Sequence, residues 1–500
     1  MTTPQLTLER LGAVALPPFA SRVRALLERD ALPIVVVATW TAVLALMMPL
    51  LVVQDTFLAL VDGRLIAKHG LPHVDTLTYW TLGRPWTDQQ WGSQLVLYEL
   101  AHRGGLLLAV LAGIGCVVVA LGAAAVGARK LGASPRSTAI GLLLPLIGYS
   151  SLTQVRTQSL ALAPFVIVYA LLALDARRSG RRVLLVLPLL IVWANLHGSV
   201  MLAAGLTAFY GLTRVRRADA RRRALLLVVG APLCVLASPY GLDLIGYYRT
   251  MLVSPPLAAF VQEWKPPSVG TATAGFFVTA FLLTALWSRH QRVLTSFERW
   301  ALPLLLIGAM TAVRNAVWFE LAAAVSFPLL LDAAWPSRIA LTAQVRRVNV
   351  MLGSFAACVA LVVLAAQFAR PATSLQRGRS PAAAAAVAAA AGARGIVLAD
   401  DEHADWLLWQ QPTLEGRVAF DVRFELFNRR ELTQISRLRL ASANAWQRCG
   451  ATSAVVTFGS SHELGLYREA GVLAPGSRTI AQGPQFAAIA QPAPRKPCRL

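Results

Sequence analysis

An aspartate at the edge of a long apolar stretch is the first residue that could do chemistry. Residues 32–53 are almost wholly apolar, and Asp55 follows where a membrane helix would leave the bilayer. A carboxylate in that place can take a proton from a hydroxyl group, although an acid there can also be only a helix end. Asp88 is a second carboxylate shortly after it. The sequence therefore predicts Asp55 as a general base, with Asp88 as a neighbouring or substitute base.

Arginines near unusual polar motifs are the second chemical signal. Arg156 and Arg314 stand at the ends of apolar segments, and Arg64 and Arg84 lie in the polar stretch between two such segments. The planar guanidinium group suits phosphate, to which it can donate two parallel hydrogen bonds. We therefore expect these four arginines to bind a phosphate group.

Aromatic and polar side chains gather in the same short motifs. Trp and Tyr at a membrane boundary are usually interface anchors, and Asn or His within an apolar stretch can satisfy a bent backbone. Each candidate therefore has a structural interpretation beside a ligand-binding one. The candidates are Trp86, Trp91, Asn195, His197, Tyr240, Glu263 and Trp264.

The elements that must position these residues are membrane spans. Of the 500 residues 56% are hydrophobic and only 14% are charged, whereas soluble proteins carry about a quarter charged residues. Several apolar segments approach or exceed the roughly 18 residues that span a bilayer. The pattern predicts about eleven spans, near 32–53, 105–127, 137–151, 158–174, 183–195, 198–213, 224–237, 271–287, 300–313, 316–333 and 348–368.

Basic residues sort onto alternate sides of these spans. Arginine-rich clusters fill one set of gaps, and the alternate gaps hold few basic residues although they are longer in total. Because positively charged loops stay in the cytoplasm, the N-terminus is expected inside and the chain after 369 outside. The formal net charge of +22 then reflects topology and not a nucleic-acid partner. The candidate residues all fall on the outer side, whereas a transporter would also place polar residues near mid-membrane.

The composition divides the chain into four parts. We expect a cytoplasmic segment (1–31), a transmembrane domain (32–369), an Ala-rich linker or helix (370–394) and an extracytoplasmic α/β domain (395–500). Within the outer loop 54–104, an amphipathic helix from Phe57 to Ile66 is expected to lie in the headgroup layer, with Asp62, Arg64 and Lys68 toward water.

The C-terminal part alternates short strands and helices, which is typical of a small α/β domain. Strands are expected at 395–400, 417–422, 453–458 and 485–490, and helices at 404–410, 429–449 and 462–470. Asp421, Arg423 and Glu425 form either an internal ion-pair network or an acceptor site. Cys449 and Cys498 lie on the oxidising side and are a candidate disulfide; the alternative is two free thiols.

The stretch 55–100 resembles a known family, the GT-C glycosyltransferase superfamily near its polyprenyl- and dolichyl-phosphate-sugar-dependent members. The matching residues include Asp55, Thr56, Gly63, Arg64, His69, Gly70, Gly83, Arg84, Pro85, Trp86, Asp88 and Trp91. The motifs "WANLHG", "SPYG", "EW" at 263–264, "RN" at 314–315 and "DVRFE" at 421–425 are also similar. The resemblance covers nearly the whole chain. It implies a multi-pass protein of the bacterial inner membrane.

The resemblance also implies a reaction and its partners. A sugar would pass from a polyprenyl-phosphate-linked donor to a hydroxyl of a glycan, lipid or protein acceptor outside the membrane. Asp55 would be the base, the four arginines would hold the donor phosphate, and the aromatic and polar candidates would bind sugar or acceptor.

The chain departs from the family pattern at the positions that could bind a divalent cation. Val53 replaces the first acid, Leu58 and Ala59 replace a Trp-His pair, and Gln89 and Gln90 replace a His-Glu pair. No cofactor is predicted, and a divalent metal stays an alternative although its candidate ligands are lost. The protein therefore either works without a metal or is a non-catalytic relative that binds lipid-linked glycan or a partner protein. A transporter is the third alternative.

Overall fold

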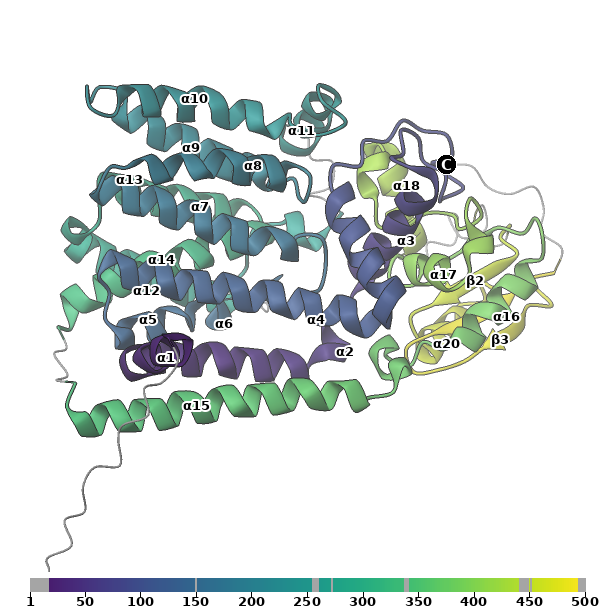
Figure 1. Cartoon of the computed structure of the whole chain (residues 1–500). Helices are drawn as coiled ribbons and strands as arrows, with labels where there is room; N and C mark the ends of the chain where they lie inside the picture. The colour runs from purple at the N-terminus through teal and green to yellow at the C-terminus, as the bar shows by residue number, and fades with distance from the viewer. Residues whose placement is uncertain are drawn as a thin grey trace, which may run out of the picture.

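A bundle of long helices and a smaller α/β domain lie side by side (Figure 1). The computed structural model describes residues 18–148, 151–253, 260–270, 273–336, 341–439, 449 and 452–492. The cytoplasmic segment expected at 1–31 therefore lies largely outside the described residues. Among these residues, five helices are long and apolar enough to cross a membrane: Phe19–Leu46, Trp91–Leu131, Ser159–Arg177, Val313–Ala334 and Ala343–Ala369.

The helices of the bundle follow the expected spans. They are α1 (Pro18–Leu46), α2 (Met48–Leu51), α4 (Trp91–Leu131), α5 (Pro135–Gly141), α6 (Leu144–Ile147), α7 (Ser159–Arg177), α8 (Val186–Ala194), α9 (Val200–Arg214), α10 (Arg221–Val235), α11 (Asp243–Val253), α12 (Ala274–His290), α13 (Ser296–Thr311), α14 (Ala316–Ala334) and α15 (Ala343–Ala366). The span expected at 137–151 is broken into the short helices α5 and α6. Pro145 lies near the start of α6, where its missing N–H costs least.

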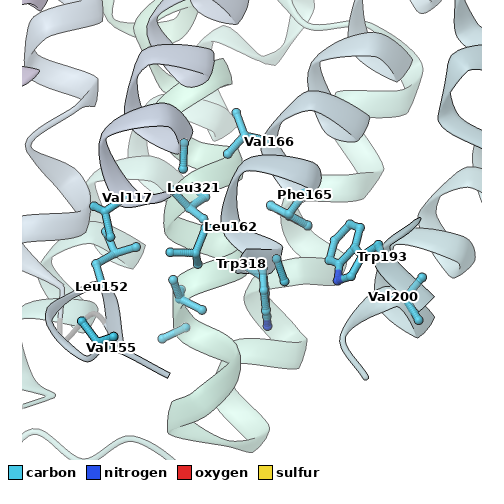
Figure 2. Packing of buried hydrophobic residues seen from close by; sticks show 14 of the residues in the cluster. Val117, Leu152, Val155, Leu162, Phe165, Val166, Trp193, Val200, Trp318 and Leu321 are labelled. Carbon is cyan, nitrogen blue, oxygen red and sulfur yellow. The ribbon is translucent and has the colours of Figure 1, made fainter. Parts of the chain in front are cut away.

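Buried hydrophobic side chains from several helices pack together inside the bundle, Phe165, Trp193 and Trp318 among them (Figure 2). Phe165 of α7 lies 5.1 Å from Trp318 of α14 between ring centroids, and Trp193 of α8 lies 6.2 Å from Trp318. All three side chains are buried. This contact fixes α7, α8 and α14 against one another although they come from distant parts of the sequence. By contrast, α15 runs along α1 at the edge of the bundle and keeps most of its apolar surface outward (Figure 1).

Helix α3 (Gln54–His69) lies between the bundle and the C-terminal domain. Gly63 lets α3 approach α4 closely, because a Cβ there would lie 2.2 Å from the backbone oxygen of Gln94. Asp62 and Arg64 are buried, and of the three charged residues expected to face water only Lys68 is exposed. The expectation that Asp62 and Arg64 face water is therefore wrong, because α17 (Ala404–Gln410) packs over α3. The position of α3 in the headgroup layer stays a prediction.

The C-terminal domain contains a four-stranded sheet with strand order β1-β2-β4-β3. The strands are β1 (Val397–Leu398), β2 (Val455–Phe458), β3 (Arg478–Ala481) and β4 (Ala487–Ala490), and the helices are α16 (Pro381–Ala391), α17, α18 (Arg429–Arg439) and α20 (Ser461–Glu469). β1 and β2 are parallel, and the other pairs are antiparallel. The strand expected at 417–422 makes only isolated bridges through Val418. The Ala-rich segment forms α16, which packs against the sheet.

Candidate active site at the outer end of the helix bundle

Asp55 lies in the first turn of α3, just beyond the apolar stretch that α1 and α2 occupy. The Thr56 hydroxyl accepts a hydrogen bond from the Val53 amide and so fixes where α3 begins. The Asp55 carboxylate accepts a hydrogen bond of 3.2 Å from Nη1 of Arg156, which stands just before α7. The Asp55 side chain is 36% exposed and that of Arg156 only 7%. A partly open carboxylate is thus paired with a buried guanidinium group.

The short 3₁₀ helix η4 (Gln262–Trp264) brings a second carboxylate to the same arginine. Nη1 of Arg156 donates to both carboxylate oxygens of Glu263, each at 2.9 Å. The next residue, Trp264, supplies the ring under the Arg314 guanidinium, 4.4 Å from its centroid. Arg314 itself lies in the 3₁₀ helix η6 (Val313–Asn315), which is joined to the η4 turn by a backbone hydrogen bond. One turn therefore positions both arginines.

Arg314 differs from Arg156 in its partners. Within the part of the chain that the structure describes, its guanidinium stacks on Trp264 but has no hydrogen bond or ion pair. The Nε atom of Arg156 is also buried without a partner there. Guanidinium donors are therefore available beside Asp55. We call Asp55, Arg156, Glu263, Trp264 and Arg314 the outer cluster.

The charges of the outer cluster influence one another. Burial raises the pKa of Asp55 above its usual range, Glu263 adds to this, and Arg156 opposes it. Burial would also raise the pKa of Glu263, but Arg156 holds it below its usual range. Burial, together with Arg314 and Arg156, lowers the pKa of His197 well below its usual range, so the ring is neutral at pH 7. His197 therefore lies within electrostatic reach of both arginines.

Arg64 and Arg84, which were expected to bind phosphate, form hydrogen bonds and ion pairs with the C-terminal domain. Arg64 donates to the backbone oxygens of Leu408 and Trp409, at 2.6 and 3.0 Å, and pairs with Glu415. Arg84 pairs with Glu431 at 2.6 Å and donates to the Leu426 backbone oxygen. Both arginines thus fasten the C-terminal domain to the 54–104 region.

Three of the expected sugar-binding residues use their polar atoms within the protein. The Trp91 indole donates to the Asn195 side-chain oxygen at 3.0 Å, and the Asn195 amide donates to the backbone oxygen of Ala237. The Tyr240 hydroxyl donates to the backbone oxygen of Pro72. These contacts join the start of α4, the end of α8 and the turn before α11, which is a structural role.

A second set of charges lies in the interface between the domains. Arg423 pairs with Asp75 at 2.8 Å and with Asp421 at 2.6 Å, and all three side chains are buried. Trp86 lies under the Arg423 guanidinium, 4.5 Å from ring centroid to carbon. Of the two interpretations for Asp421 and Arg423, the contacts are those of an ion-pair network. We call Asp75, Asp421 and Arg423 the buried cluster.

Asp88 lines a separate cavity next to the buried cluster, together with Asp62, Gln94 and Glu425. Sequence reasoning did not select Asp62 and Gln94. One signal was present, since Asp62 follows Asp55 by seven residues and therefore lies on the same face of α3. Nothing local pointed to Gln94, whose amide donates to Asp62 at 3.1 Å.

The described residues do not fit a metal site. Among them there is no group of three His, Cys, Asp or Glu side chains that could hold a metal ion. Asp55 and Glu263 are both turned to Arg156, which takes the place a cation would have between two carboxylates. Cys449 is disulfide-bonded, whereas Cys498 lies outside the described residues, so their pairing stays a prediction.

No protein-family model and no curated protein sequence matches the chain, but solved structures do. ArnT from Cupriavidus metallidurans, bound to undecaprenyl phosphate, is similar with a TM-score of 0.52 and 14% identity over 91% of this chain and 97% of that one. The same protein in the apo state is similar with a TM-score of 0.52 and 12% identity, over 88% of this chain and 93% of that one. The archaeal oligosaccharyltransferase AglB from Archaeoglobus fulgidus has a TM-score of 0.47 and 12% identity, over 84% of this chain and 68% of that one. The chain therefore has the fold of the ArnT structures, a bundle of apolar helices with a C-terminal α/β domain. This is the fold that the resemblance to the GT-C superfamily predicts.

Proposed function

We propose that this protein is a membrane glycosyltransferase that transfers a sugar from a polyprenyl-phosphate-linked donor to a hydroxyl group outside the membrane. The observation that carries the proposal is the outer cluster: a partly exposed carboxylate, Asp55, lies beside arginine donors that have no hydrogen-bond partner among the described residues. The similar ArnT structure holds undecaprenyl phosphate, which supports a donor of that class.

In the proposed reaction the acceptor oxygen attacks the anomeric carbon of the donor sugar. The bond from that carbon to the phosphate oxygen breaks, and the polyprenyl phosphate leaves with the electron pair. Asp55 takes the acceptor's proton, so one carboxylate suffices where a glycoside hydrolase needs two. The raised pKa of Asp55 makes it a stronger base than an ordinary aspartate.

The arginines stabilise the leaving phosphate. Its negative charge grows as the bond breaks, and fixed donors that meet this charge lower the barrier. Arg314 offers uncommitted guanidinium donors, and Trp264 holds the group in place by stacking. Arg156 supplies a second positive charge. Because Arg156 is shared between Asp55 and Glu263, a bound phosphate would draw it away from Asp55 and leave that carboxylate free to accept a proton.

The donor can be identified directly. Lipids that copurify with the full-length protein would be separated and analysed by mass spectrometry, and the lipid-linked sugar found there would be supplied to protein in nanodiscs. We expect a polyprenyl-phosphate sugar that the protein consumes, with free polyprenyl phosphate as a product. A protein that retains such a lipid but never consumes it, with any extracytoplasmic extract as acceptor source, would contradict transfer and support the non-catalytic alternative.

The proposal requires the outer cluster to face the outside of a bacterial inner membrane. Ser179, in the loop after α7, and Glu469, in α20, are on opposite sides in this orientation. Single cysteines at these positions, in a background without the native cysteines, should react with an impermeant maleimide on intact spheroplasts only at 469. Reaction at 179 under the same conditions would contradict the orientation.

A further inference from the structure

A cavity lies between α3 and the C-terminal domain, close to the outer cluster but separate from it. Its lining includes Leu58 and Asp62 of α3, Asp88, Gln94 and Glu425. Leu58 and Asp62 follow Asp55 by three and seven residues, so the cavity extends along the same face of the helix. At about 1.5 Å per residue, Asp62 lies about 10 Å along the helix from Asp55. We call it the interface cavity.

Four oxygen atoms of the cavity lining are buried without a hydrogen-bond partner among the described residues. They are Oδ1 of Asp62, Oδ2 of Asp88, Oε1 of Gln89 and Oε1 of Gln94. Each of these side chains is at most 3% exposed. A buried polar atom without a hydrogen bond costs about 1–3 kcal/mol. Several such atoms in one place indicate that a ligand or water forms hydrogen bonds with them. Ionised carboxylates and amide oxygens accept hydrogen bonds, whereas Nη1 of Arg423, in the same lining, is a buried donor without a partner in the described part of the chain. The partner must therefore both donate and accept hydrogen bonds, as a hydroxyl group does.

The charge of the interface cavity limits which donors fit. Asp62, Asp88 and Glu425 are acids, while the one arginine of the lining, Arg423, is already paired with Asp75 and Asp421. Burial raises the pKa of Asp88 and of Glu425 to about 7. At neutral pH these groups are therefore part ionised and part protonated, and a phosphate or carboxylate would meet acids rather than free cations.

We propose that the interface cavity binds an uncharged, hydroxyl-rich part of the sugar acceptor, and that it excludes anionic acceptors. This inference rests on the proposed function, because it gives the molecule that Asp55 deprotonates a place to be held. The empty volume is only about 250 Å³ even with the open mouth included. The cavity therefore takes one small group, such as the edge of a terminal sugar ring.

The connection to the outer cluster supports the assignment to the acceptor. The Gln90 side chain lines the interface cavity and accepts a hydrogen bond from the Thr157 hydroxyl, next to Arg156. A molecule held in the cavity thus lies between α3 and the C-terminal domain, next to the residues that lead to Arg156. The donor phosphate, in contrast, is assigned to the arginines of the outer cluster.

The test measures binding and needs neither donor nor turnover. Methyl glucoside and sodium glucuronate serve as neutral and anionic probes, titrated against the full-length protein in nanodiscs with tryptophan fluorescence or calorimetry as readout. We expect saturable binding of methyl glucoside and at least tenfold weaker binding of glucuronate. Asp88→Leu should weaken methyl glucoside binding about tenfold, in line with the loss of a hydrogen bond to a charged group. Asp88→Asn, which keeps size and hydrogen-bonding capacity, covers the case in which Asp88→Leu does not fold. Its affinity for methyl glucoside should lie between those of the parent and of Asp88→Leu.

The controls separate this site from others. Asp243→Leu makes the same change at an exposed position of α11 and should leave binding within twofold of the parent. Saturation with decaprenyl phosphate, the carrier without its sugar, should also leave methyl glucoside binding unchanged.

Equal binding of the two probes, or parental binding by both Asp88 variants, would overturn the proposal. Competition by decaprenyl phosphate would place the sugar site with the donor instead. Probe binding without any transfer would refute the proposed function and leave the cavity assignment standing.

Discussion

The outer cluster and the buried cluster are built from the same residue types but differ in what their charges meet. In the buried cluster Arg423 lies between Asp75 and Asp421, and Asp75 also accepts hydrogen bonds from Thr78 and Thr81. In the outer cluster the two carboxylates share Arg156 and are about one-third exposed.

Arg314 adds a guanidinium that has no ion pair among the described residues. A closed network of charges fastens two domains together, whereas an open one can exchange a partner for a substrate. Exposure to solvent, and not residue type, separates the two roles.

The largest effect should come from the base of the outer cluster. Asp55→Asn keeps the size and polarity of the side chain but cannot accept the proton. Transfer should fall by about 10²–10⁴, the usual worth of a general base, while the melting temperature and the affinity for decaprenyl phosphate stay near the parental values. Single-turnover rates with the copurified donor would measure the loss.

Parental transfer by Asp55→Asn would make Asp55 only a helix end. Binding with no transfer in either protein would favour the non-catalytic alternative.

The corresponding change in the buried cluster should affect stability and not chemistry directly. Arg423→Leu leaves Asp75 and Asp421 as buried carboxylates without their cation, which costs about 3–5 kcal/mol. Thermal unfolding of the full-length protein, followed by tryptophan fluorescence, should show a clearly lowered transition. Arg478→Leu, at an exposed position of β3, is the matched control and should unfold like the parent. A parental transition for Arg423→Leu would mean that this network does not stabilise the interface.

Arg314→Gln should weaken both donor binding and turnover. The arginine meets the phosphate before and during bond breaking, so its loss acts on the ground state and on the transition state. A hydrogen bond to a charged group is worth about 1.5–3 kcal/mol, which corresponds to about 10- to 150-fold in decaprenyl phosphate affinity. Arg249→Gln, an exposed charge change on α11, is the control. Unchanged affinity in Arg314→Gln would exclude a phosphate-binding role.

Glu263→Gln should move the pH dependence of the reaction. The Glu263 charge raises the pKa of Asp55, and Glu263 also shares Arg156 with it. Removing that charge lowers the pKa of Asp55, so the base becomes ionised at lower pH. The acidic limb of the rate profile should therefore shift to lower pH, and the melting temperature should change little. A purely structural role for Glu263 would lower the rate equally at all pH values.

The smallest effect concerns pH and the domain interface. The pKa values of Asp88 and Glu425 are about 7 in the folded protein and lie near 4 in an unfolded chain. The folded state therefore binds more protons between these values, and the free energy of unfolding should fall as pH rises through 7. Asp75, whose pKa is lowered, stays ionised throughout this window. The melting temperature should be higher at pH 5.5 than at pH 8.5, with a smaller difference in Asp88→Asn, and an equal difference would contradict the assignment.

Several features of the fold followed from local pattern. Apolar length predicted the helices of the bundle, and the alternation of short strands and helices predicted the C-terminal α/β domain, including the helix at 404–410. The orientation that the arginines indicate stays a prediction. These signals are local, because hydropathy and periodicity are properties of neighbouring residues. The expected strand at 417–422 failed for the same reason: the local sequence suits a strand, but pairing depends on distant partners, and Val418 meets Val397 and Thr78 only through isolated bridges.

The sequence by itself determined the ingredients of the candidate site, namely an aspartate and arginines gathered in motifs on one side of the membrane. Only the tertiary structure decided which of them meet. Asp55 and Arg156 are 101 positions apart, and Arg156 and Glu263 are 107 apart. Arg64 and Arg84 look equally suitable in sequence, yet their donors are used by carbonyls and carboxylates more than 340 positions away. An ion pair forms where the packing of helices and domains brings two charges within about 4 Å, and no local pattern records that distance.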